Sequence, residues 1–154
     1  MTTPRVAAIH DMSGFGRCSL TVAIPVLSAM GVQCCPLPTA FLSTHTGGFT
    51  GFTFLDMTEE MPKVAAHWKS LNLHFNAVYS GFLASEQQLR IVSDFIRTFR
   101  WEDTLVVIDP VMGMMGSLSD LYPCSMQRHV TFGRTGRCYH PQSDRSRFFA
   151  GLLI

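Results

Sequence analysis

Residues 5–20 read RVAAIHDMSGFGRCSL, and this stretch decides how the fold begins. A short apolar run stops at an acid, a serine and two spaced glycines, and a helical pattern follows. This order predicts a β-strand, a turn over residues 11–16 and a helix behind it. Ligands bind at the carboxyl ends of strands in open parallel α/β sheets, so Asp11 and Ser13 are candidate ligand-binding residues. An ordinary connection with a helix-capping serine would give the same spacing.

Composition limits the class of protein. The chain has 154 residues, of which 47% are apolar, and its formal net charge is +1. No apolar run of about 18 residues is present to span a membrane, and the N-terminus lacks a secretory signal, so we expect a cytoplasmic protein. The odd number of cysteines, five, has no zinc-ligand spacing and indicates reduced thiols. The near-neutral charge argues against a nucleic-acid partner.

The charge is distributed unevenly along the chain. Residues 1–116 hold seven Lys or Arg and nine Asp or Glu, a net of −2, whereas residues 117–154 hold five Arg and two Asp, a net of +3. We therefore expect two parts, a folded part over 1–116 and a tail of different character over 117–154.

The first part alternates strand and helix signals. Residues 18–30 predict a buried helix that Gly31 ends, with a kink or a late start caused by Pro25. Residues 33–37 predict a second strand, short or at an edge because Pro36 lies within it and Pro38 follows it. Residues 39–54 are rich in Gly, Thr and aromatic side chains, which indicates either a flap over a site or a β-excursion from the sheet.

The pattern then repeats twice. Thr58 is a candidate cap for an amphipathic helix over residues 61–71, and residues 77–82 predict a strand. Ser85 and Gln88 form a capping-box signature for a helix that extends to Phe99. The apolar, β-branched run 104–108 predicts a buried parallel strand, so Asp109 places a second acid at a carboxyl end.

Four motifs of the first part occur in an order that resembles the pyridoxal and pyridoxamine kinases of the ribokinase-like superfamily. They are the strand followed by Asp11-x-Ser13-Gly14-x-Gly16, then Ser43–Thr46, Ser80–Phe82 and Asp109–Gly113. The resemblance covers residues 4–113. It implies an α/β fold of three layers, α/β/α, with a mostly parallel central sheet, of which this chain holds the N-terminal half. It also implies ATP-dependent phosphorylation of the 5′-hydroxymethyl group of a B6 vitamer, Mg²⁺ as cofactor, and a homodimer in the full-length family.

The resemblance assigns roles to individual residues. Asp11, next to Ser13, matches the position that faces the polar edge of the pyridine ring, and an acid there would accept from a ring hydroxyl or pair with a protonated nitrogen. His45 and Thr46 match a His-Thr pair beside the bound ring, and Phe82 stands where relatives often have Tyr. Asp109 belongs to a different part of the site, because it matches the acid near the phosphates and Mg²⁺. The resemblance implies no residue that binds the metal directly. Relatives usually continue with another acid after Gly113, whereas two methionines follow here.

The tail after Gly116 has a different sequence pattern from the first part. Residues 131–147 show neither a period of 2 nor one of 3.6, which fits a disordered basic tail or a nucleic-acid-binding arm. If the codons of residues 138–150 are read one nucleotide later, however, the genetic code permits VITPNLTEAAFLL. That reading resembles the family's next element, a strand ending in Thr-Pro-Asn-x-x-Glu. We therefore expect a change of reading frame between residues 113 and 118 and a poorly ordered, out-of-frame tail over 117–154.

The frame change has a consequence for activity. In the family, the Asn and Glu of the lost element, an anion hole and the catalytic base lie beyond this point, so no catalytic residue is expected in frame. We expect a kinase by ancestry that is inactive in this form. Three alternatives remain: a hydroxymethylpyrimidine kinase of thiamine synthesis, although the turn lacks the Gly-Ala-Gly pattern of those enzymes; a non-catalytic vitamer-binding protein; and an interaction protein whose basic tail binds RNA or acidic partners.

Overall fold

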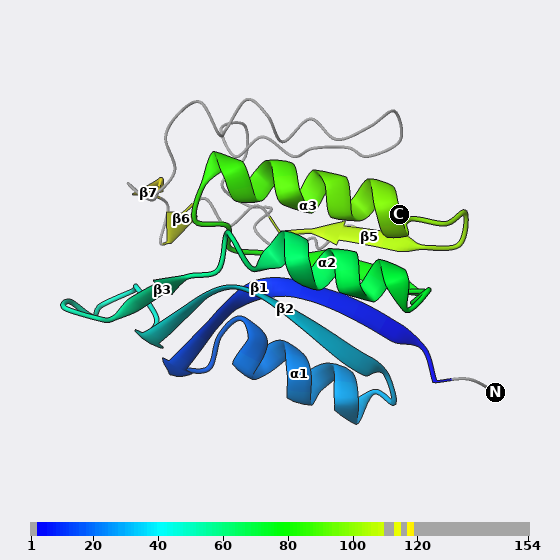
Figure 1. The fold of residues 1–154 in the computed structure, drawn as a ribbon. Coiled ribbons are helices and arrows are strands. Elements are labelled where there is room, and N and C mark those ends of the chain that lie inside the picture. The colour runs from blue at the N-terminus through cyan, green and yellow to red at the C-terminus, as the bar shows by residue number, and fades with distance from the viewer. Residues whose placement is uncertain (1–2, 110–112, 115–116, 119–154) are drawn as a thin grey trace.

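A computed structural model describes residues 3–109, 113–114 and 117–118 of the chain (Figure 1). The predicted tail therefore lies outside the described residues, except for Ser117 and Leu118. None of the described helices combines the length and apolarity needed to cross a membrane. The elements, in chain order, are β1 Arg5–Phe15, α1 Leu20–Ala29, β2 Gln33–Thr44, β3 Phe54–Asp56, α2 Met61–Ser70, β4 Ala77–Ser80, α3 Glu86–Phe99, β5 Leu105–Ile108, β6 Gly113–Met114 and β7 Ser117–Leu118.

The main sheet has five strands in the order β3-β2-β1-β4-β5, and β6 and β7 pair with each other in a separate ladder. β2, β1, β4 and β5 are parallel, and only the short β3 is antiparallel to its neighbour β2. Figure 1 shows α1 on one face of this sheet and α2 and α3 on the other. The predicted three-layer α/β fold with a mostly parallel sheet is therefore confirmed.

The larger core lies between the sheet and the α2–α3 layer. Its aromatic centre is formed by Phe75, Phe95 and Phe99, with ring centroids 4.5 to 6.0 Å apart. Ile9 of β1 and Val78 of β4 contribute the sheet side of the same cluster. α3 supplies its apolar residues at steps of three and four, so one face of the helix is buried, as its period predicts.

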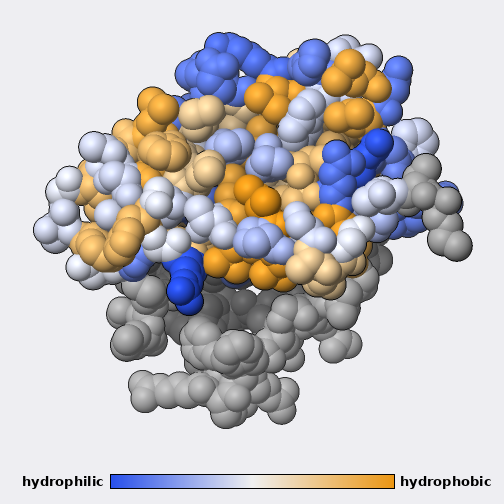
Figure 2. Space-filling view, turned by 90° about the horizontal axis from the view of Figure 1, so that it is seen from below, coloured by the Kyte–Doolittle hydropathy of each residue, from blue (hydrophilic) through white to orange (hydrophobic). Residues whose placement is uncertain are grey.

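The α1 layer is less well covered. α1 is apolar on most faces, and it buries Leu20 and Ala23 against the sheet. Val22, Val26 and Met30, which follow one another at steps of four on its outer side, are exposed. Seen from below, the molecule accordingly shows hydrophobic groups between polar ones (Figure 2). The helix begins at Leu20, later than the predicted residue 18, and continues through Pro25 to Ala29 before Gly31.

The predicted second strand was too short. β2 runs over twelve residues and pairs with β1 almost throughout. Gln33 donates its N–H to Pro4 on the β1 side, at 2.8 Å, and N–H groups alternate in direction along a strand. Pro36 and Pro38 therefore lack N–H groups that would point away from β1, where β3 does not yet reach. Because β3 pairs with β2 only from Ala40 onward, the two prolines remove no hydrogen bond between these strands.

Three further features differ from what the sequence predicts: the end of β1, the cap of α2 and the burial of β5. β1 continues through the predicted turn to Phe15 because its later residues still pair with β2, so Asp11 and Ser13 lie within a strand. Thr58 does not cap α2, since its hydroxyl and its N–H both bond to Asp56. β5 is half-buried rather than buried, because it is the last strand of the sheet in the described residues.

The strand predicted over residues 77–82 ends at Ser80, and two further predictions for this part are confirmed at least in part. Residues 39–54 form a β-excursion, in which the end of β2 returns antiparallel as β3. Ser85 caps α3 by accepting from the Gln88 N–H at 3.2 Å. The reciprocal half of the capping box is replaced, because the Gln88 side chain bonds elsewhere.

Candidate functional site

The carboxyl ends of β2, β1, β4 and β5 lie at one edge of the sheet (Figure 1). α1 connects β1 to β2 across one face, whereas α2 leads to β4 across the opposite face. The strand order therefore reverses between β1 and β4, and such a switch point is where open α/β sheets bind ligands. The predicted site residues Asp11, His45, Phe82 and Asp109 come from four neighbouring strands or the residues just after them, so the fold brings them to this edge.

Asp11 is the buried acid of the site, with 6% of its surface exposed. One carboxylate oxygen accepts from the Ser13 hydroxyl at 2.9 Å, and the other accepts from the Ser19 hydroxyl at 2.5 Å. No Lys or Arg of the described residues forms an ion pair with it. The carboxylate is thus held in place by neutral hydroxyls while its charge has no cationic partner in this part of the chain.

Ser19 was not predicted as a site residue. It stands at the N-cap of α1 with φ 51° and ψ −132°, a left-handed conformation that is strained for serine. Its hydroxyl does not cap the helix but bonds to Asp11 instead. The Asp11 carboxylate therefore joins the strand to the start of α1, which is a structural role, and its binding role stays a prediction.

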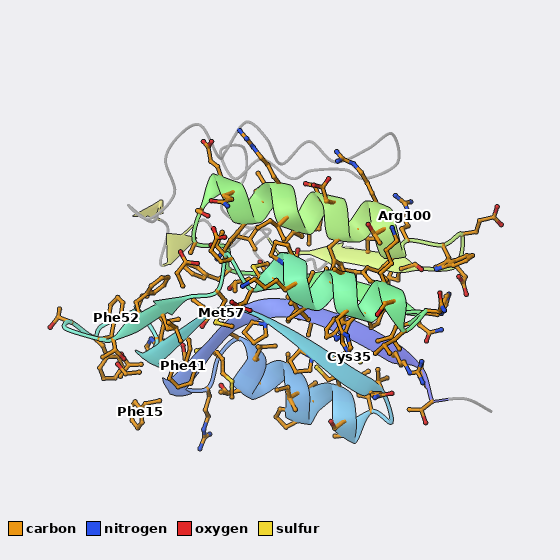
Figure 3. All side chains as sticks on the ribbon, in the orientation of Figure 1. Phe15, Cys35, Phe41, Phe52, Met57 and Arg100 are labelled. Atoms are coloured by element: carbon orange, nitrogen blue, oxygen red, sulfur yellow. The ribbon has the colours of Figure 1, made fainter. Side chains whose placement is uncertain are left out.

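His45 lies against the glycine turn. It donates its backbone N–H to Phe15 at 3.2 Å, and its ring packs edge-on to Phe49 at 4.9 Å. A Cβ on Gly16, which has φ +134°, would lie 2.7 Å from the His45 ring, so this close approach requires glycine. Thr46 follows and is exposed. Figure 3 shows Phe15 projecting at this end of the sheet, on the same side as Phe41 and Phe52.

Phe82 and Asp109 follow β4 and β5. The Phe82 carbonyl accepts from the Thr39 hydroxyl at 3.0 Å, which ties the residue to β2. Asp109 donates its N–H to Ser80 at 2.8 Å. Desolvation raises the pKa of the Asp109 carboxyl. Burial also raises the pKa of Tyr79, and the Asp109 charge adds to that shift. Since Asp109 is itself exposed to solvent, the shift carries little energy.

His10 is another site residue that was not predicted from the sequence. It precedes Asp11, is only 4% exposed, and packs edge-on against Tyr79 with ring centroids 4.2 Å apart. Its Nε2 is buried and has no hydrogen-bond partner among the described residues. A Cβ on Gly81 would lie 2.2 Å from its Nδ1, so the ring occupies the space left by that glycine. The only signal in the sequence was a histidine beside an acid at a strand end.

Burial lowers the pKa of His10 to about 4, against a weaker opposing effect of Asp11. The unfolded chain therefore takes up a proton between pH 6.5 and 4 that the folded chain does not. We expect the contribution of His10 to the free energy of unfolding to fall by about 3 kcal/mol as the pH is lowered through this window. Below pH 4 this contribution should no longer change. Urea titrations of the wild type and His10→Gln across pH 7 to 4 test this. Parallel curves for the two proteins would contradict it.

The edge suits an organic ring better than a metal ion. Hydroxyls, a buried carboxylate and aromatic side chains gather there, and such mixed surroundings are typical of small-molecule sites. No three His, Cys, Asp or Glu side chains come together as a metal site within the part that the structure describes. Asp109, a single acid, does not make a Mg²⁺ site without further ligands.

Comparisons with known proteins agree with this architecture. No family model matches the chain. A provisionally named phosphomethylpyrimidine kinase from Bacteroides thetaiotaomicron is 53% identical, over 83% of this chain, with a TM-score of 0.80. An orthorhombic form of that protein, 54% identical over 82% of this chain with a TM-score of 0.78, was crystallised with pyridoxal. Pyridoxal kinase from Lactobacillus plantarum is 32% identical over 79% of this chain, with a TM-score of 0.73. The chain spans 43 to 44% of the length of these proteins.

Proposed function

We propose that the chain is the N-terminal part of a ribokinase-like kinase of the kind that includes pyridoxal kinases, and that its sheet edge is the vitamer-binding half of a pyridoxal kinase site. The whole protein would transfer the γ-phosphoryl group of ATP to the 5′-hydroxymethyl group of pyridoxal, pyridoxamine or pyridoxine. Asp11, Ser13, His45, Thr46 and Phe82 would contact the vitamer, and Asp109 would lie toward the phosphates.

One observation carries this proposal: the Asp11 carboxylate is buried without a cationic partner among the residues that the structure describes. A buried charge is costly unless hydrogen bonds or an opposite charge compensate it, and two hydroxyl donors compensate it only in part. A ligand that brings a ring hydroxyl or a protonated ring nitrogen would supply the missing donor. Pyridoxal, found with the Bacteroides relative, offers both groups.

Asp11→Asn tests this role without changing the size of the side chain. We expect the dissociation constant for pyridoxal to rise by about 10- to 100-fold, because a charge-assisted hydrogen bond is lost. Equilibrium dialysis or quenching of protein fluorescence measures it. Asp94→Asn, on the exposed side of α3 where Asp94 pairs with Arg97, is the matched control. Equal affinities of the wild type and Asp11→Asn would count against the assignment.

A second candidate substrate is hydroxymethylpyrimidine or its phosphate, because the Bacteroides relative is named as a phosphomethylpyrimidine kinase. Its ring also carries nitrogen and an exocyclic donor, so Asp11 is compatible with either ligand. Competition between hydroxymethylpyrimidine and bound pyridoxal, at equal concentrations and in one buffer, separates the two. We expect pyridoxal to be the tighter ligand.

The ATP side depends on residues past Asp109. Family members use Mg²⁺ with ATP, and ADP is bound in the pyridoxal kinase of Leishmania donovani, whose 21% identity supports the fold alone. The described residues of this chain do not fit a Mg²⁺ site by themselves. Their contribution is to bind and orient the acceptor hydroxyl, which is a large part of catalysis in phosphoryl transfer.

We also propose that residues 117–154 are translated in a frame that differs from that of the family. The support is the shifted reading of residues 138–150, which restores a Thr-Pro-Asn-x-x-Glu element, together with the abrupt change in charge. The nucleotide sequence of codons 113–118 and of the frames downstream tests this. A codon series that cannot encode the family element in any frame would refute it.

A further inference from the structure

Gln88 is the most completely bonded buried side chain of the described residues. It lies in the first turn of α3 and has no exposed surface. Its amide nitrogen donates to the Thr39 carbonyl at 2.8 Å and to the Thr58 hydroxyl at 2.9 Å, with Asp56 at 3.2 Å. Its amide oxygen accepts from the Ala84 N–H at 2.8 Å. Each hydrogen-bonding group of the amide is therefore engaged.

The main effect of such a network is to fix the relative positions of the segments that it joins, and its contribution to the free energy of folding is smaller. A buried amide costs free energy unless it is satisfied, and the net gain from each bond is small. A satisfied network, in contrast, permits one arrangement of the segments that it joins. Gln88 joins three of them: the middle of β2, the end of β3 with the lead into α2, and the loop before α3.

The joined segments carry the candidate site. Thr39 lies where the pairing of β1 with β2 shifts between His10 and Met12, opposite the site acid. Its carbonyl accepts from Gln88 and also from the Met57 N–H at 3.1 Å, and its hydroxyl donates to the Phe82 carbonyl. Figure 3 shows Met57 at the point where the β2–β3 excursion leads into the α2 layer. Gln88 thus reaches Phe82 through Thr39 and reaches the base of the excursion directly.

We propose that Gln88 is a positioning residue that, through Thr39, fixes the backbone of Phe82 relative to the β2–β3 excursion, and so sets the affinity for the ring of the ligand. The inference rests on the proposed function, because it assumes that Phe82 and the excursion contact the same ligand. Gln88 itself touches no ligand.

Two variants of the full 154-residue chain separate positioning from folding. Gln88→Met keeps the volume and the helix propensity but removes every side-chain bond. Thr39→Val removes only the bond to Phe82, with nearly the same shape, and keeps the Thr39 carbonyl in place for Gln88. Ser93→Ala is the control, since Ser93 lies on the same helix and bonds only to its own Leu89 carbonyl.

Pyridoxal is the probe, and hydrogen exchange at the Met57 and Ala84 amides is the second readout. We expect Gln88→Met and Thr39→Val to raise the dissociation constant for pyridoxal about tenfold, and Ser93→Ala to leave it unchanged. Exchange should quicken at both amides in Gln88→Met. If that variant fails to fold, Thr39→Val decides alone.

The outcomes distinguish the two proposals. If the wild type binds pyridoxal and both Gln88→Met and Thr39→Val bind it with the same affinity, the positioning role is overturned. The proposed function is then unaffected. Faster exchange without a change in affinity would give Gln88 a purely structural role and overturn it too. Failure of the wild type to bind pyridoxal would overturn the proposed function, and the positioning role with it.

Discussion

Replacing Gly81 with alanine is expected to lower the melting temperature by about 10 °C, the largest effect on stability of any substitution proposed for this chain. The new Cβ would lie 2.2 Å from Nδ1 and 2.4 Å from Cε1 of His10. His10 cannot swing away freely, because it is buried beside Tyr79. Either the ring or the β4 end must move, and overpacking of this kind costs about 3 kcal/mol.

A double-mutant cycle shows whether the clash is the cause. His10→Ala alone leaves a cavity and destabilises, but in that background Gly81→Ala has no ring to meet. We expect the second substitution to cost less than about 0.5 kcal/mol there. Thermal or urea unfolding of the four proteins provides the coupling energy. An equal cost of Gly81→Ala in both backgrounds would place its effect in the backbone and not in the contact with His10.

The order of strands and helices could be predicted from the sequence because hydrophobic period and capping residues act locally. Ser85 and Gly31 mark helix ends that the structure confirms. The errors arise where pairing between distant segments overrides a local signal. Two glycines suggested that β1 ends at Asp11, but β2 continues beside it to Thr44. The prolines of β2 suggested a short strand, but the N–H groups that they lack would point away from β1, so the pairing of β2 with β1 is not interrupted.

The candidate site was predictable to the same extent. Acids and serines that follow apolar strands mark the carboxyl edge of a parallel sheet, and this placed Asp11 and Asp109 correctly at that edge. The roles of His10 and Gln88 depend on contacts with Gly81 and Thr39, which lie far away in the sequence. No local pattern indicates such contacts. Gln88 in particular was predicted only as half of a capping box.

The largest expected effect on activity concerns the reading frame. The described residues contain the proposed vitamer side, whereas the family's Asn, Glu, anion hole and base are not encoded after Asp109 in the present frame. Phosphoryl transfer depends on positioning and on stabilising charge, so loss of that whole set removes most of the rate enhancement. We expect the 154-residue chain to phosphorylate pyridoxal at least about a thousandfold more slowly than the same protein with its frame shifted near codon 116.

The decisive measurement is therefore a paired assay of phosphoryl transfer. Both proteins are incubated with Mg·ATP and with pyridoxal, pyridoxine, pyridoxamine or hydroxymethylpyrimidine, and the phosphorylated product is quantified by chromatography. We expect product from the reframed protein, with a B6 vitamer preferred, and none above background from the 154-residue chain. Equal turnover by the two proteins would contradict the frame change, and the absence of turnover from the reframed protein would contradict the assignment of a kinase site.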